Sequence, residues 1–389
     1  MEQKAETVKT PWLRIILTVL ALLASAALCI AVAAGFLKTL ATGSGAPSKS
    51  VQGTALKAEV GKRFDMYINN RLSGALDGVL AIRKTYWLSD GDISAPKPDP
   101  AAYGVCSSPA ELMPVLEQAA ELLEGQSMYF TADTRILEGS QIRYYLDETI
   151  LAITWKQDRA GSVYTFCEVK IAHPSQLRRF LSGGAYGSEI RQTTTEMAQS
   201  VNAVLASSGD FYGFRRAGVV CHDGIVYRAD RLHEVDTCFI DDQGEMILSK
   251  AGSFRSREEA QAFVNEHNIR FSLAFGPILV DGGQRPSVDE YPLGDVEAYA
   301  TRAVLGQRDK LHYVIAVCNL EGKYQFLPLM SMFQNNITDI GCDRVYALDG
   351  GQTAVIALNG ELVNSVHFGT QRDITDIFYF ATAIPDGEK

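Results

Sequence analysis

Residues 144–172 read YYLDETILAITWKQDRAGSVYTFCEVKIA, and this stretch decides the fold class. Its two ends, 144–156 and 163–172, are rich in β-branched and aromatic side chains, which favour strands. The segment 157–162 between them is polar and contains a glycine, as a hairpin turn does. The pattern predicts two consecutive antiparallel strands.

The same turn signal recurs further along the chain. His222-Asp223-Gly224, Asp242-Gln243-Gly244 and Asn359-Gly360 each lie between apolar runs, and such pairs are typical of hairpins. Helical patterns intervene without regular alternation, at 174–181, 194–201, 256–266 and 329–339. We therefore expect an α+β fold with a mixed, largely antiparallel sheet and flanking helices, not a doubly wound fold.

The N-terminal region predicts one transmembrane helix that precedes this domain. Residues 15–37 carry no charged side chain and lie between Arg14 and Lys38. A helix of that length can cross the hydrocarbon core of a bilayer. Basic residues precede the span, and the positive-inside rule then places residues 1–14 in the cytoplasm. We expect a single-pass protein of the cell membrane with an extracellular C-terminal domain.

A cleaved signal peptide is the alternative, although the apolar stretch is longer than the usual hydrophobic region of one. Beyond the span, residues 38–58 include a flexible linker rich in Gly, Ser and Ala. Residues 59–140 form an accessory, mainly helical segment, in which Ser108-Pro109 is a helix start with a cap and a first-turn proline. Residues 141–389 hold the strands and the candidate chemistry.

Composition limits the partners and cofactors of the chain. The formal net charge is −10, so no basic surface for nucleic acid is expected. No Cys or His spacing points to zinc. Calcium is conceivable at Asp241, Asp242, Asp373 and Asp376, but exposed turn aspartates explain these residues more simply, and we expect no cofactor. The cysteines beyond the span either form disulfides or act as small buried hydrophobic residues.

An acidic residue, Asp210, lies where an apolar strand ends. It follows Ser208 and Gly209, and Tyr212 comes two residues later. Loops at strand ends are where a rigid scaffold presents reactive groups. Asp210 is therefore a candidate catalytic residue, although most Gly-Asp pairs simply cap a turn.

A second such residue is Asp349, which follows the apolar run 345–348. Gly350 and Gly351 come next, and their N–H groups can form an anion nest. The alternative is an ordinary turn between two strands. Gln352 and Thr353 complete this block.

Two arginines complete the set of candidate residues. Arg302 begins an apolar strand pair, and Arg372 precedes Asp373 near the end of the chain. A guanidinium group is a planar fork that matches phosphate or carboxylate. Each arginine alone is more simply a surface or packing residue, but together with two strand-end aspartates they indicate an anionic ligand.

Six blocks of sequence resemble the phosphodiester glycosidase family. They occur in the family's order between about 200 and 380, as SGDFYG (208–213), DGIVYR (223–228), TRAVLG (301–306), ALDGGQT (347–353), NGELVN (359–364) and RDITD (372–376). The family includes an animal N-acetylglucosamine-1-phosphodiester glycosidase and bacterial proteins of the exopolysaccharide biosynthesis type. This chain departs from the pattern at Ser208, where the family has Asn, at Thr301, where it has Pro, and at Thr353-Ala354, where it has Ser-Ser or Ser-Thr.

The resemblance implies hydrolysis of a sugar 1-phosphodiester at its glycosidic C–O bond, in cell-surface polysaccharide processing. Asp210 and Asp349 would be catalytic, one stabilising or attacking the oxocarbenium ion and the other activating water. The remaining candidates would bind substrate, the arginines at its phosphate: Arg302, Arg372, Thr353, Gln352, Gly350, Gly351, Ser208 and Tyr212.

Two other functions use the same residues. A non-catalytic domain could bind or scaffold an anionic glycopolymer of the cell envelope through the same arginines, and the Ser208 departure favours this slightly. A phosphodiesterase would instead cut the P–O bond on the other side of the linkage.

Overall fold

The structure is a computed structural model that describes residues 86–89, 94–123, 136–209, 211–293 and 295–387. The expected span at 15–37, the linker at 38–58 and Asp210 lie outside the described residues. Within the described ranges, no helix is long and apolar enough to cross a membrane. The description below concerns the unit that runs from Ala81 to Lys389.

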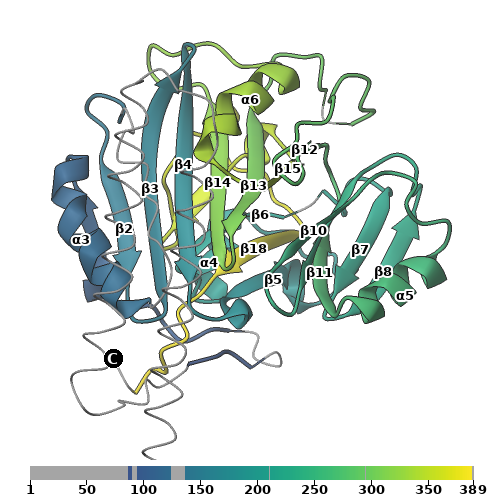
Figure 1. The fold of residues 1–389 in the computed structure, drawn as a ribbon, viewed down its shortest axis with the longest axis horizontal. Coiled ribbons are helices and arrows are strands. Elements are labelled where there is room, and N and C mark those ends of the chain that lie inside the picture. Colours follow the sequence, from purple (N-terminus) through teal and green to yellow (C-terminus); the bar gives the residue numbers. More distant parts are fainter. Residues whose placement is uncertain (1–85, 90–93, 124–135, 210, 294, 388–389) are drawn as a thin grey trace, which may run out of the picture. The chain divides into compact units, whose positions relative to one another are not determined.

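The largest sheet has eight strands in the order β1-β2-β3-β4-β14-β13-β15-β12 (Figure 1). Every pair of neighbours in it is antiparallel. Its strands are β1 (Tyr103–Cys106), β2 (Ile142–Leu146), β3 (Ile150–Arg159), β4 (Ser162–Ile171), β12 (Ile278–Val280), β13 (Arg302–Asp309), β14 (His312–Asn319) and β15 (Arg344–Leu348).

Two five-stranded sheets accompany the large one, and their pairings are antiparallel as well. One has the order β10-β9-β11-β7-β8, with β7 (Gly218–His222), β8 (Ile225–Asp230), β9 (Thr237–Asp241), β10 (Met246–Ser249) and β11 (Ile269–Leu273). The other has the order β17-β16-β6-β18-β5, with β5 (Leu177–Leu181), β6 (Leu205–Ser208), β16 (Ile356–Leu358), β17 (Glu361–Leu362) and β18 (Asp376–Phe380).

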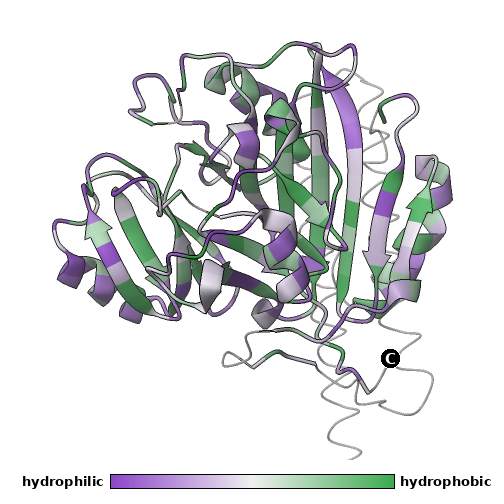
Figure 2. Ribbon diagram, turned by 180° about the vertical axis from the view of Figure 1, so that it is seen from behind, coloured by the Kyte–Doolittle hydropathy of each residue, from purple (hydrophilic) through white to green (hydrophobic). Residues whose placement is uncertain are grey.

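The α-helices of the described part are short and lie outside the sheets: α3 (Pro109–Leu122), α4 (Thr194–Ser200), α5 (Arg257–Glu266) and α6 (Met330–Ile337). In Figure 2 their ribbons carry much hydrophilic colour, whereas hydrophobic stretches run along the strands. Helix α3 begins as predicted, because the Ser108 hydroxyl accepts the N–H of Glu111. The expected combination of antiparallel sheets with flanking helices is thus confirmed for the described residues.

Two local predictions were wrong. Residues 144–156 are not one strand, because Asp147 Oδ1 accepts the N–H groups of Thr149 and Ile150 at 2.7 and 3.0 Å and turns the chain between β2 and β3. Residues 174–181 are not a helix: after one 3-10 turn at Pro174–Gln176 the chain continues as β5, which pairs along its length with β18. Long-range pairing overrides the local helical pattern there.

The three predicted turns are confirmed as hairpin connections. Asp223-Gly224 joins β7 to β8, residues 242–245 join β9 to β10, and Asn359-Gly360 joins β16 to β17. Asn359 and Gly360 both adopt positive φ, of 55° and 67°. These two residue types tolerate that conformation best, which is why the sequence signal was reliable.

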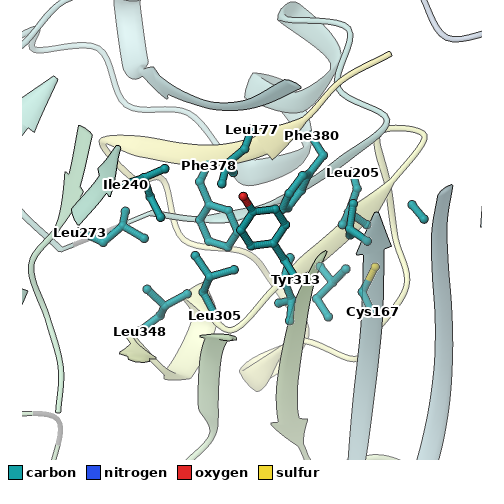
Figure 3. Packing of buried hydrophobic residues seen from close by; sticks show 14 of the residues in the cluster. Cys167, Leu177, Leu205, Ile240, Leu273, Leu305, Tyr313, Leu348, Phe378 and Phe380 are labelled. Carbon is teal, nitrogen blue, oxygen red and sulfur yellow. The ribbon is translucent and has the colours of Figure 1, made fainter. Parts of the chain in front are cut away.

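The two faces of the large sheet are buried by different partners. One face packs against α3 and α6 through Leu112, Leu116 and Phe333, so the helix of the accessory segment shares a core with the strands. The other face packs against β5, β6 and β18; Figure 3 shows Tyr313 beside Phe378 and Phe380 in this cluster. Leu348, the last residue of β15, belongs to the same cluster. The core therefore fixes the position at which β15 ends.

The cysteines of the described part are all buried and free: Cys106, Cys167, Cys221, Cys238, Cys318 and Cys342. Of the two interpretations of these residues, the structure supports small buried hydrophobic side chains.

Candidate functional site

A pocket of about 260 Å³ lies where β15 ends and β13 begins. It is formed by the loop after β15, the loop before β13 and the segment between β17 and β18. The residues that line it are Phe275, Asp295, Tyr299, Ala300, Thr301, Arg302, Leu327, Leu348, Asp349, Gly350, Gly351, His367 and Arg372. Five of the sequence-predicted residues are thus brought together in one hollow: Asp349, Gly350, Gly351, Arg302 and Arg372.

The two glycines after Asp349 are required by the backbone. A Cβ at Gly350 would lie 2.2 Å from the carbonyl oxygen of Thr301, which leaves no room for any side chain. Gly351 has a φ of +64°, a region that favours glycine. The N–H groups of both are already used, by Asp349 Oδ1 at 2.9 Å and by the Thr301 hydroxyl. The expected anion nest is therefore not formed; these amides instead fix the loop.

Asp349 has an unusual environment for a carboxyl group. Its side chain is 16% exposed, and its Oδ2 atom is buried without a hydrogen-bond partner. Burial raises the pKa of Asp349 to about 6; the nearby Thr353 hydroxyl, the Arg372 guanidinium and the Gly350 N–H act in the opposite direction. The group consequently changes charge close to neutral pH, as a general base or acid must.

Arg372 lies beside this carboxyl group and stays accessible. Its Nη1 atom is 3.8 Å from Asp349 Oδ2, and its side chain is 37% exposed. The rings of Phe211 and Phe214 lie 5.5 and 5.7 Å from its guanidinium carbon, and its backbone N–H donates to the carbonyl of Gln352. The aromatic rings and the backbone bond hold this cation at the pocket while leaving it able to contact an anion.

Arg302 differs from Arg372 in its burial and in its hydrogen-bond partners. It is 4% exposed, and its Nη2 donates to the carbonyl oxygens of Asp295 and Ala298 at 2.9 and 2.6 Å. Burial lowers the pKa of its guanidinium group. Arg302 therefore ties the loop before β13 to the pocket wall, and its direct contact with phosphate stays a prediction.

The other predicted residues lie behind the pocket or away from it. The hydroxyl of Ser208 donates to the backbone carbonyl of Thr353, and the hydroxyl of Thr353 donates to the backbone carbonyl of Gly350 at 2.7 Å. Both side chains therefore stabilise the loop after β15. Gln352 Nε2 donates to the carbonyl and hydroxyl oxygens of Thr370, both at 3.0 Å. Tyr212 is buried, stacks on Tyr186 at 5.4 Å and is not among the lining residues.

The described part of the chain contains no group of three or more His, Cys, Asp or Glu residues that could hold a metal ion. Asp376 is instead paired with Arg179 at 2.8 Å, both side chains being fully buried. Asp241 caps its own turn, because its Oδ1 accepts the N–H groups of Gln243 and Glu245. These two aspartates therefore have structural roles.

Sequence reasoning missed several lining residues, notably Tyr299, Thr301 and His367. Thr301 adjoins Arg302 and was noted only as a departure from the family pattern. Tyr299 is 64% exposed at the pocket, and His367 lies in a short 3-10 turn, His367–Gly369. Neither residue stands in a repeated or strand-end pattern, so no sequence signal distinguished them from surface residues.

Comparisons with known proteins support the resemblance given above. Residues 201–381 match the family model of the phosphodiester glycosidases. Over 199 residues the chain is 25% identical to the SPbeta prophage-derived uncharacterized protein YomE of Bacillus subtilis (strain 168), a stretch that is 49% of this chain and 30% of that protein. The chain thus spans less than a third of that relative's length.

Two solved structures are also similar. One is the zebrafish N-acetylglucosamine-1-phosphodiester alpha-N-acetylglucosaminidase catalytic domain auto-inhibited by its pro-peptide, with 13% identity, a TM-score of 0.49, and coverage of 64% of this chain and 86% of that one. The other is a hypothetical protein from Synechocystis, with 12% identity, a TM-score of 0.44, and coverage of 62% and 64% respectively.

Proposed function

We propose that this chain, through its phosphodiester glycosidase family domain at residues 201–381, hydrolyses a sugar 1-phosphodiester at the glycosidic C–O bond. One observation carries the proposal: Asp349, whose pKa is raised to about 6, has a carboxyl oxygen without a hydrogen-bond partner and lies next to an accessible arginine in a pocket. A site that binds a charged substrate and transfers protons at neutral pH needs a carboxyl group of raised pKa beside a cation.

The reaction consumes one water and releases a free sugar and a phosphomonoester. The C–O bond at the anomeric carbon breaks, and its electron pair goes to the phosphate oxygen. Phosphate leaves readily, so the larger need is to supply a nucleophile and to stabilise the positive charge on the sugar. Asp349 acts in its ionised form, either by taking the proton of the attacking water or by attacking the anomeric carbon itself.

Arg372 is proposed to hold the phosphate and to neutralise the charge that the leaving group gains. Asp210 is proposed as the second carboxylate; it lies outside the described residues, so this role rests on its sequence position between Gly209 and Phe211. Ser208 and Thr353 act through the loop rather than on substrate, because their hydroxyl groups are used by backbone carbonyls.

The test is release of sugar over time from a panel of sugar 1-phosphodiesters, with Asp349→Asn as the decisive variant. The wild-type protein should turn over many times, and the variant should lose activity by at least about a thousandfold while keeping its circular dichroism spectrum. Asp242→Asn is the matched control, because Asp242 is an exposed turn residue and should retain full activity. Full activity of Asp349→Asn would remove this residue from the mechanism.

A second candidate function is binding of an anionic glycopolymer without turnover. It is favoured by Ser208, which supplies no amide group to a substrate. In that case the phosphodiester would bind in a one-to-one ratio and no sugar would be released.

The site of action is proposed to be the cell surface, with processing of envelope polysaccharide as the process. This rests on the uncharged stretch 15–37 alone. Protease treatment of intact cells should remove the C-terminal domain if it lies outside; full protection would contradict the proposal.

A further inference from the structure

We propose that His367 is a second phosphate-contacting residue of this pocket, beside Arg372. The inference rests on the proposed function, because it assumes that the ligand of the pocket carries a phosphate. It adds a residue that no sequence motif indicated.

Few hydrogen-bond donors of the pocket remain available to a ligand. The N–H groups of Gly350 and Gly351 are taken by Asp349 and Thr301, and two bonds of Arg302 go to backbone carbonyls. Apart from these, the lining contains few strong donors: the hydroxyl groups of Tyr299 and Thr301, the guanidinium of Arg372 and the imidazole of His367. Only the last two can carry a positive charge.

His367 and Arg372 belong to the same segment, which is fixed to the loop after β15. Gln352 donates to Thr370 in the middle of this segment, and Arg372 N–H donates to the carbonyl of Gln352. Both side chains are therefore on a segment that is anchored to the loop that carries Asp349. Two donor side chains five residues apart, on one anchored segment and in one pocket, suit a single phosphate group.

The local conformation at His367 also favours this role. Its ring nitrogens have no hydrogen-bond partner among the described residues, and its ring contacts that of Phe368 at 3.9 Å between centroids. Phe368 has a φ of +59° and is 82% exposed. A bulky residue rarely adopts that backbone conformation, and such strain is more common at binding sites than elsewhere.

The experiment measures binding of sulfate and of dimethyl phosphate to the full chain by calorimetry, at one fixed pH near neutral. His367→Gln removes the imidazole, and His367→Lys replaces it with an ammonium donor. His233→Gln is the matched control, because His233 is exposed and does not line the pocket.

We expect His367→Gln to weaken sulfate binding about tenfold, the size of one charge-assisted hydrogen bond. His367→Lys should bind sulfate at least as tightly as the wild-type protein does, because its ammonium group is a charged donor. The effect on dimethyl phosphate should be smaller, because it carries one charge.

Unchanged sulfate binding by His367→Gln would overturn the inference, and so would a loss that His367→Lys does not restore. Neither readout requires turnover. If sulfate binding depends on His367 but the protein releases no sugar, the proposed reaction is therefore refuted and this inference stands.

Discussion

Asp349 and Asp376 are both aspartates paired with an arginine, yet their surroundings give them opposite properties. Asp376 lies 2.8 Å from Arg179 with both side chains fully buried, and Arg179 also donates to the carbonyls of Cys221 and Ser272. Asp349 Oδ2 lies 3.8 Å from Nη1 of an accessible Arg372, and that oxygen has no hydrogen-bond partner. The sealed pair is closed to a ligand, whereas the open pair lines a pocket.

The largest effect should come from breaking the sealed pair. Asp376→Asn leaves the buried Arg179 charge without a carboxylate partner, and we expect a loss of about 3–5 kcal/mol in the free energy of unfolding. Asp230→Asn removes the partner of Arg216 in an exposed pair and should cost less than about 1 kcal/mol. Urea unfolding measures both, and equal losses would show that burial does not separate the two kinds of pair.

Asp349→Asn, the same substitution in the open pair, should change the free energy of unfolding in the opposite direction. The folded protein raises the pKa of Asp349 to about 6 from an ordinary 3.8, so ionising this group opposes folding. The penalty is absent below about pH 4, grows between about pH 4 and about pH 6, and stays at about 3 kcal/mol above that. Asp349→Asn should therefore stabilise the protein at pH 8 and leave it unchanged near pH 4. A destabilised variant at pH 8 would mean that the carboxylate is held by partners after all.

Arg372→Gln tests whether the open cation serves substrate. One charge-assisted contact to phosphate contributes about 1.5–3 kcal/mol, so kcat/KM should fall by about 10–150-fold. Stability should change little, because the side chain is partly exposed. A normal kcat/KM with reduced stability would place Arg372 with the structural arginines.

The smallest expected effect is a shift of the pH profile. If Asp349 works in its ionised form, kcat/KM rises about tenfold per pH unit up to about pH 6 and then levels off. Arg372→Gln removes a charge that lowers the pKa of Asp349, so the rising limb should move to higher pH. A rate that falls above pH 6 would instead identify Asp349 as a proton donor.

Features that depend on a few neighbouring residues could be predicted from the sequence. The hairpin at Asn359-Gly360 and the cap at Ser108 are set by local backbone chemistry, and both are found. Residues 174–181 could not be assigned correctly, because their conformation is decided by pairing with β18, some two hundred positions away.

The residues of the candidate site also differ in whether the sequence could predict them. Asp349 was identified because an apolar strand visibly ends in Asp-Gly-Gly, and that strand end is part of the core. The role of Arg302 was hidden, since its partners are backbone carbonyls that no motif reports. His367 and Tyr299 enter the pocket only through the tertiary arrangement of loops.

The most direct test of the central claim is hydrolysis of a sugar 1-phosphodiester in ¹⁸O-labelled water, followed by mass spectrometry of both products. Cleavage of the glycosidic bond by a reaction that uses Asp349 predicts label in the anomeric hydroxyl of the sugar and none in the phosphomonoester. Label in the phosphomonoester would show that the P–O bond is broken, and the proposed function would then be wrong.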